Sequence, residues 1–200
     1  MKKLYFIALM CMFTLGCAAH NNDAANHDKT EKAVQVSQKT LKGSWVADAK
    51  KFVGAEDQKN IQEASMIFNF DGEALSIVIE MDMHFAEESV QMSMDMGIRM
   101  SCIGKYTLAD RVITPNSFVT APKVEVTKFN LNCSDEVRNA LNEAGMNEDK
   151  FKSMLLDGMK KGGLDSMSQT FESEIIVVSM TNSSMVLKDC KENFLIFKRR

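Results

Sequence analysis

From residue 41 onward, apolar and polar positions alternate in short runs, a pattern typical of β-strands with one buried and one solvated face. The alternation is most regular in residues 75–85 and 90–102. Its apolar positions are Leu75, Ile77, Ile79, Met81, Met83 and Phe85 in the first run, and Val90, Met92, Met94, Met96, Ile98, Met100 and Cys102 in the second. Glu87-Glu88 lies between the runs, so the pattern predicts one long antiparallel hairpin.

Shorter alternating runs on both sides of this hairpin predict further strands. Asp71-Gly72 follows the run 65–70 and predicts a type I′ turn, in which both central residues need positive φ. The remaining strands are expected at 41–46, 104–108, 111–114, 123–131, 173–180, 185–188 and 193–199. A change of phase between Val126 and Phe129 predicts a bulge. Because the connections read as hairpins, the expected fold is all-β, an antiparallel up-and-down barrel of about eight strands.

Residues 134–161 interrupt the β pattern with apolar positions at helical spacing. Ser134 is the expected N-cap of a first helix that ends at Gly145, and Gly162-Gly163 is expected to end a second helix. The two-helix insertion is interpreted either as a pair lying on the barrel or over its mouth, or as an insertion without a role of its own.

The first residues have the organisation of an export signal, interpreted as a signal peptide over residues 1–16. Two lysines precede an apolar run that is shorter than the about 20 residues needed to span a bilayer. Thr14-Leu15-Gly16-Cys17 resembles the lipobox of bacterial lipoproteins, which implies cleavage before Cys17 and a diacylglycerol on its thiol. The usual lipobox has Leu, Val or Ile where this chain has Thr14, so ordinary secretory cleavage is the alternative.

Residues 17–39 are polar and free of aromatic side chains, so they bury too little apolar surface to fold. They are interpreted as a tether between the lipid and a single domain, residues 40–200. His20 and His27 lie in this tether and are interpreted as linker residues rather than metal ligands. Membrane attachment then depends on lipid, because two or three acyl chains bind almost permanently and one binds only marginally.

Charge and motif content argue against nucleic acid as a partner and against catalysis. The chain has 24 basic and 27 acidic side chains, and removing the signal peptide makes it more acidic. No basic block stands out. His84 is the sole histidine of residues 40–200, and the chain has no Gly-rich phosphate loop, His-Glu-x-x-His or Cys-x-x-Cys motif. We therefore expect a non-enzymatic protein without a cofactor.

The cysteines suit an oxidising compartment. Cys11 leaves with the signal peptide and Cys17 carries the expected lipid, which leaves Cys102, Cys133 and Cys190. A disulfide between Cys102 and Cys133 is the preferred pairing, because both lie at the ends of expected strands. The alternative is three buried free thiols, since free cysteine behaves as a small apolar side chain.

The two ends of the domain resemble those of lipocalins. Gly43-Ser44-Trp45 looks like the Gly-x-Trp strand that opens lipocalins and their relatives, and the terminal Phe197-Lys198-Arg199 looks like the end of their closing strand. The resemblance implies a calycin-like β-barrel in which Lys198 or Arg199 packs across Trp45, a cation–π contact of about 1 kcal/mol. With the lipobox and tether, the layout resembles the lipocalin-like lipoproteins of Bacteroidetes, but the helical pair departs from true lipocalins.

The methionines of the long hairpin are the candidate binding site. These are Met81, Met83, Met92, Met94, Met96 and Met100. They are interpreted as the lining of a cavity for an apolar ligand, as the filling of a solid core, or as soft thioether ligands for Cu(I). Copper binding predicts that Met92→Leu with Met94→Leu abolishes Cu(I) uptake. His84 points to the opposite face by alternation and could not join such a site.

The expected function is non-catalytic binding of a small apolar or amphipathic ligand by a lipid-anchored protein of the cell envelope. The alternative is a structural or partner-binding protein with a packed barrel, whose interface is the exposed face of residues 134–161. Ligand pockets are typically about 300–1,000 Å³, whereas a filled small barrel has none. No acidic cluster follows Cys17, so the periplasmic face of the outer membrane is the expected location.

Overall fold

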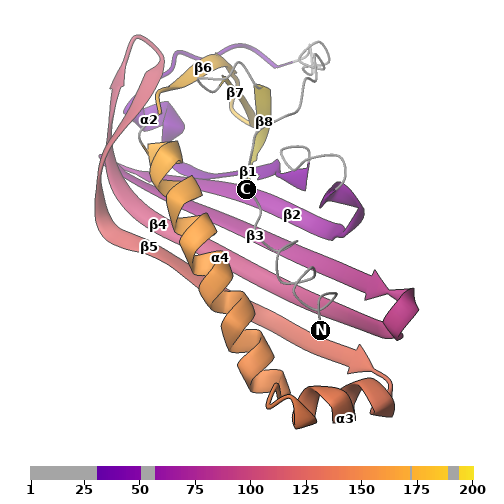
Figure 1. Cartoon of the computed structure of the whole chain (residues 1–200). Coiled ribbons are helices and arrows are strands. Elements are labelled where there is room, and N and C mark those ends of the chain that lie inside the picture. Colours follow the sequence, from indigo (N-terminus) through magenta and orange to yellow (C-terminus); the bar gives the residue numbers. More distant parts are fainter. Residues whose placement is uncertain (1–30, 51–56, 172, 189–193) are drawn as a thin grey trace.

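The computed structural model describes residues 31–50, 57–171, 173–188 and 194–200 (Figure 1). Its strands are β1 (Gly43–Asp48), β2 (Ile61–Asp71), β3 (Ala74–Glu87), β4 (Met92–Ala109), β5 (Val112–Cys133), β6 (Ile175–Met180), β7 (Ser184–Lys188) and β8 (Phe194–Arg199). Its helices are α2 (Gln38–Leu41), α3 (Asp135–Glu143) and α4 (Glu148–Phe171), with two short 3-10 helices, η3 (Asp57–Lys59) and η4 (Glu88–Val90).

The strands form one antiparallel ring in which each pairs with its neighbours in sequence and β8 returns to β1. The closing register joins Trp45 to Arg199 and Val46 to Lys198. The predicted all-β, up-and-down barrel is therefore confirmed. We call the face of the sheet that carries Trp45 and Met96 the inner face, and the opposite face, which carries Val46, the outer face.

The ring closes unevenly along its length. β3, β4 and β5 have 14, 18 and 22 residues, whereas β6, β7 and β8 have 6, 5 and 6. β5 pairs with β6 only through Val112 and Ile113. Beyond that point the short strands no longer face the long ones, and α4 crosses the long strands instead (Figure 1).

The inner face therefore has two packed regions. Near the ring closure, Phe68 stacks with Phe197 at 4.8 Å between ring centroids, and Phe70 contacts Tyr106 edge-on at 5.3 Å. Under α4, the aromatic ring of Phe129 on β5 lies 6.4 Å from that of Phe151. The helical insertion is thus part of the core, because α4 replaces the missing strands as the cover of the long sheet.

Two tight turns differ from the turn types that the sequence predicts. The β2–β3 loop is Gly72-Glu73, and only Gly72 has positive φ (62°), which is the pattern of type II′ rather than the predicted type I′. The β4–β5 loop is Asp110-Arg111, in which both residues have positive φ, 46° and 70°. The type I′ geometry is therefore in a loop without glycine.

The free edge of β5 carries features that discourage pairing with another chain. Both prolines of the chain, Pro115 and Pro122, lie in this strand. The pairing with β4 also shifts register at several points, one of them at Thr127, so the predicted bulge between Val126 and Phe129 is confirmed. Proline, bulges and lysines such as Lys128 are the usual protection of an exposed edge strand.

The predicted end of the second helix is wrong. α4 continues through Gly162-Gly163 to Phe171, ten residues beyond the expected 161. Glycine inside a helix costs about 1 kcal/mol relative to alanine, but it does not break the backbone ladder as proline does. The predicted stop at Gly145, which takes φ 68° between α3 and α4, is correct.

The boundary of the tether also needs correction, because residues from Glu31 onward are bound to the barrel. Glu31 accepts a hydrogen bond from the Ser183 hydroxyl at 2.7 Å, and the Val34 amide donates to the Met180 carbonyl at 2.9 Å. The side chains of Val34 and Val36 pack against the core. These two valines supply the apolar contact that the purely polar reading of residues 17–39 overlooked.

Candidate functional site

The methionines of the hairpin lie on the inner face, as predicted from the alternation. Met83 pairs across the sheet with Met96, and Met94 pairs with Phe85. Met83, Met94, Met96 and Met100 are 1%, 3%, 1% and 3% exposed. Met81 and Met92, the remaining two of the set, are partly exposed.

The cover over these side chains comes from α4. Phe151 and Leu155 face the sheet and are each 3% exposed. A ligand-sized cavity would leave its lining accessible to water, but the four buried thioethers expose almost no surface. The structure therefore places them in packed core.

The one histidine of the domain lies on the outer face, as the alternation predicts. Its Nδ1 is 2.7 Å from Asp95 Oδ1, an adjacent cross-strand pair. The hydrogen bond from His84 holds the pKa of Asp95 below its usual value. Among the described residues, no group of three or more histidine, cysteine or acidic side chains could hold a metal ion.

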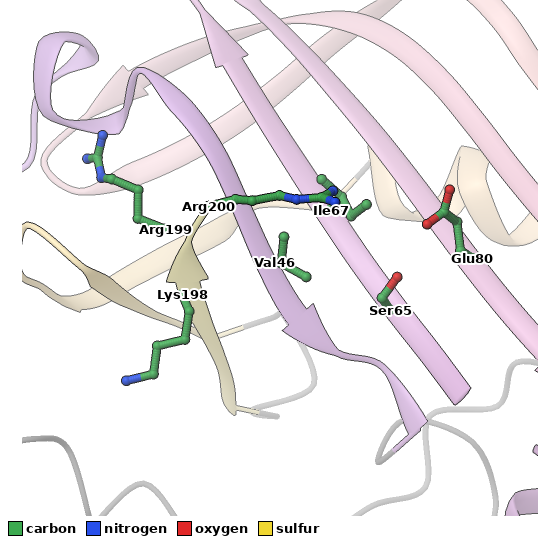
Figure 2. Close-up of a pocket in the computed structure, with 7 residues that line it drawn as sticks. All are labelled: Val46, Ser65, Ile67, Glu80, Lys198, Arg199 and Arg200. Carbon is green, nitrogen blue, oxygen red and sulfur yellow. The ribbon is translucent and has the colours of Figure 1, made fainter. Parts of the chain in front are cut away.

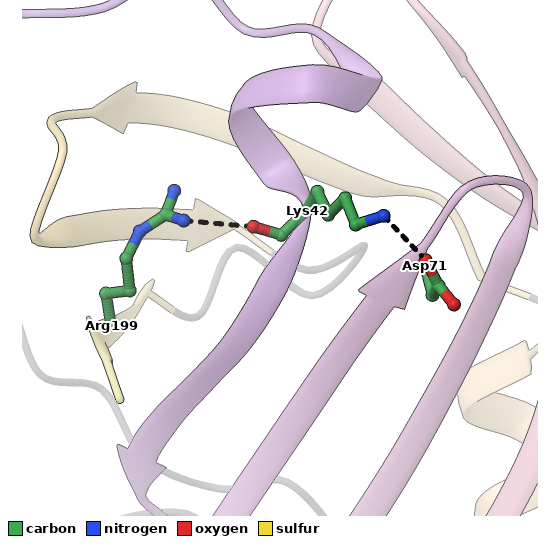
Figure 3. A network of polar contacts seen from close by, with 3 residues as sticks. All are labelled: Lys42, Asp71 and Arg199. Atoms are coloured by element: carbon green, nitrogen blue, oxygen red, sulfur yellow. Dashed lines mark hydrogen bonds and ion pairs between the residues drawn. The ribbon is translucent and has the colours of Figure 1, made fainter.

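The predicted contact at the bottom of the barrel forms with Arg199 and not with Lys198. The Arg199 guanidinium carbon lies 4.2 Å from the centroid of the Trp45 ring. One terminal nitrogen donates to the Lys42 carbonyl at 2.9 Å, as Figure 3 shows. The other donates to the Thr40 carbonyl at 2.6 Å. Lys198 is one residue earlier on β8 and so belongs to the outer face, beside Val46.

The short helix α2 prepares this contact. Ser37 and Thr40 form a reciprocal capping box that starts the helix. The indole Nε1 of Trp45 donates to the Leu41 carbonyl at 2.7 Å, and Leu41 is fully buried. Gly43 follows with φ 122°, a conformation that favours glycine, and a Cβ there would lie 3.4 Å from the Arg199 guanidinium.

Sequence reasoning missed two clefts, the first of which is hollowed into the outer face. The first has a volume of about 400 Å³ and lies where the end of β8 meets β1 and β2 (Figure 2). Its lining residues are Val46, Ser65, Ile67, Glu80, Lys198, Arg199 and Arg200. No sequence signal marks this cleft, because it depends on the register that brings β8 beside β1.

The second cleft, of about 560 Å³, borders the first, since both include Ser65 and Glu80. It also includes positions of the inner face, Met81 and Ile98 among them. It carries charges of both signs, among them Asp48, Lys50 and Arg99. Glu80 is 3.3 Å from Arg99 on the neighbouring strand, so part of this charge is already paired. Of the predicted methionines only Met81 lines a cleft described here.

The predicted disulfide between Cys102 and Cys133 is wrong, because both thiols are free. Cys133 pairs with Met92 at the start of β4, whereas Cys102 lies ten residues further along that strand. At about 3.4 Å per residue the two are roughly 34 Å apart, far beyond the Cα separation of a disulfide. Burial raises the pKa of Cys102 to about 12. Cys17, Cys11 and Cys190 lie outside the described residues.

The functional argument rests on the geometry described above. Within the described residues, no helix is both long enough and apolar enough to cross a membrane. A scan against protein-family models finds no match to the chain, and a search of curated proteins finds none either.

Proposed function

We propose that the protein is a non-catalytic, lipid-anchored component of the cell envelope whose barrel is a packed scaffold that binds through its surface. The observation that carries this proposal is the burial of Met83, Met94, Met96 and Met100 in one core cluster with side chains of α4. The cysteine of the lipobox, Cys17, supplies the anchor, and the outer membrane is the proposed location. Metabolic labelling with a radioactive fatty acid should mark the chain and should fail to mark the Cys17→Ser variant.

The packed interior has a direct test in Met96→Trp. Forcing a larger side chain into a packed core costs about 1–3 kcal/mol, whereas an open cavity accepts it at little cost. We expect the free energy of unfolding in urea to fall by that amount. Met154→Trp is the matched control, because Met154 on α4 is 41% exposed and should tolerate the change. Unchanged stability in Met96→Trp would point to a cavity.

The partner surface in this proposal is the outward face of α3 and the first half of α4. Met154 is among the large apolar side chains exposed on the described residues, and Lys150, Asp157 and Lys160 surround it on the same helix. An apolar centre with a charged rim is the usual composition of a protein interface. A photo-reactive residue at position 154 should give one discrete crosslinked protein in cells, and one at the exposed Val119 should give none.

A second candidate function is binding of an apolar ligand between α4 and the sheet. The richness of this contact in methionine favours it, because thioether side chains adapt to occupants of different shape. The mature chain would then bind a fluorescent fatty acid saturably, and Met96→Trp would abolish that binding. Absence of saturable binding, together with destabilisation by Met96→Trp, would leave only the packed scaffold.

A further inference from the structure

The chain enters the barrel next to the first outer-face cleft. Glu31 Oε2 accepts hydrogen bonds from the hydroxyl and the amide of Ser183, at 2.7 and 3.3 Å. The Ser183 carbonyl in turn accepts from the Arg199 amide at 2.7 Å, and the next residue, Ser184, pairs with Lys198. The tether therefore leaves the domain beside the terminal residues of β8.

The cleft at this point combines an apolar floor with two cations that make no close ion pair among the described residues. Val46 and Ile67 form the floor, and the Arg200 side chain extends across it, as Figure 2 shows. The Arg200 amide donates to the Ser44 carbonyl at 2.9 Å, which fixes the end of the chain over β1. Within the part of the chain that the structure describes, neither Lys198 nor Arg200 has a carboxylate within 4.0 Å.

The other charges of the cleft are already engaged. The Glu80 carboxylate lies 3.3 Å from Arg99 on the adjacent strand. The Arg199 guanidinium is turned to the opposite face, where it stacks on Trp45 and donates to two carbonyls. The pKa of Glu31 is lowered chiefly by hydrogen bonds from Thr181 and Ser183, with a smaller contribution from the charge of Lys198. Lys198 and Arg200 are therefore the cations of the cleft whose side chains make no close ion pair with, or stack on, another described residue.

An exposed apolar side chain adjoins these cations on the same face. Ile196 precedes Lys198 by two positions on β8, so both point outward, and Ile196 is 39% exposed. Apolar side chains flanked by cations fit the boundary between the headgroups and acyl chains of a lipid bilayer.

We propose that the outer face at the end of β8, centred on Lys198, Arg200 and Ile196, docks onto an anionic phospholipid surface. This inference rests on the proposed lipid anchor at Cys17. The fourteen-residue span from Cys17 to Glu31 reaches at most about 50 Å. A tether of that length keeps the face near the membrane, where each basic side chain strengthens binding about five-fold.

The test uses the mature chain without its lipid, as the Cys17→Ser variant, in flotation with vesicles. We expect binding to vesicles that contain phosphatidylglycerol, weaker binding at raised salt, and none to pure phosphatidylcholine. Lys198→Gln with Arg200→Gln should weaken binding about 25-fold. The matched control, Lys105→Gln with Lys128→Gln, removes two cations elsewhere on the long strands and should leave binding unchanged.

Several results would overturn the inference. Equal binding to both kinds of vesicle, no binding to either, or an equal loss in the control variant would each exclude this docking face. Suppression of vesicle binding by millimolar inorganic phosphate at constant ionic strength would assign the cleft to a free anion instead. Because the chain carries no lipid in this experiment, its failure is separate from a failure of lipid labelling at Cys17.

Discussion

The guanidinium of Arg199 lies over the ring of Trp45, 4.2 Å from its centroid, and joins the two ends of the domain. The same group donates to the carbonyls of Thr40 and Lys42, which lie at the C-terminal end of the short helix α2. The contact thus joins the first strand, the last strand and the helix that precedes the barrel.

Replacing Arg199 by glutamine should destabilise the fold by about 1–2 kcal/mol. The change removes a cation–π contact of about 1 kcal/mol and hydrogen bonds to two carbonyls. Urea denaturation gives the free energy of unfolding for each variant. Lys198→Gln is the control, since its side chain belongs to the outer face and should matter by less than about 0.5 kcal/mol. An equal loss in the two variants would contradict the assigned role of Arg199.

Replacing Gly97 by alanine should cost about 1–2 kcal/mol, because a Cβ there would lie 2.6 Å from Thr127 Oγ1 and 2.8 Å from Asp82 Oδ1. Adding Thr127→Ala should recover part of the loss by removing the nearest atom. Gly158→Ala on α4 is the opposite control, because nothing lies within 4 Å and alanine favours a helix by about 1 kcal/mol. Thermal unfolding should then give a lower midpoint for Gly97→Ala and a higher one for Gly158→Ala.

The alternation of side chains was enough to predict which residues face the interior, but it could not predict distances along the sheet. Period two placed the methionines of the hairpin on the buried face and His84 on the opposite one. The same alternation could have predicted that Arg199, and not Lys198, contacts Trp45, because Arg199 lies on the same face of β8 as the buried Phe197. The Cys102–Cys133 pairing failed because register decides how far apart two strand positions lie.

The helical and cleft features depended on contacts that no local pattern encodes. Gly162-Gly163 predicted a helix end, but α4 continues through both residues, since glycine lowers helix propensity without removing a backbone hydrogen bond. The first cleft forms only once β8 returns to β1, a pairing between residues more than 150 positions apart in sequence. Closure of the barrel was therefore expected, but the register of that closure, and with it the first cleft, was beyond the reach of the sequence.

Thiol reactivity should separate the two described cysteines in a Cys190→Ser background. Burial raises the pKa of Cys102 to about 12, so at pH 8 only about one molecule in 10,000 carries its thiolate. Iodoacetamide should therefore modify the partly exposed Cys133 in the native chain and Cys102 only after unfolding. Detection of a Cys102–Cys133 crosslinked peptide under non-reducing conditions would contradict the free thiols.

Acid should release the end of the tether before it unfolds the barrel. Hydrogen bonds from Thr181 and Ser183 lower the pKa of Glu31 below 4.5. A lowered folded-state pKa means that the contact is fully formed above pH 4.5 and is lost as the pH falls through the lowered value. Limited digestion with pepsin across this range should then cut near residues 32–36 first, because detached termini are preferred cleavage sites.

Glu31→Gln should show the same early cut at higher pH under a protease active there, with an unchanged urea midpoint. Glu73→Gln is the matched control on an exposed turn and should leave cleavage unchanged. If cleavage near residues 32–36 never precedes cleavage of the barrel at any pH tested, residues 31–36 unfold only with the whole domain.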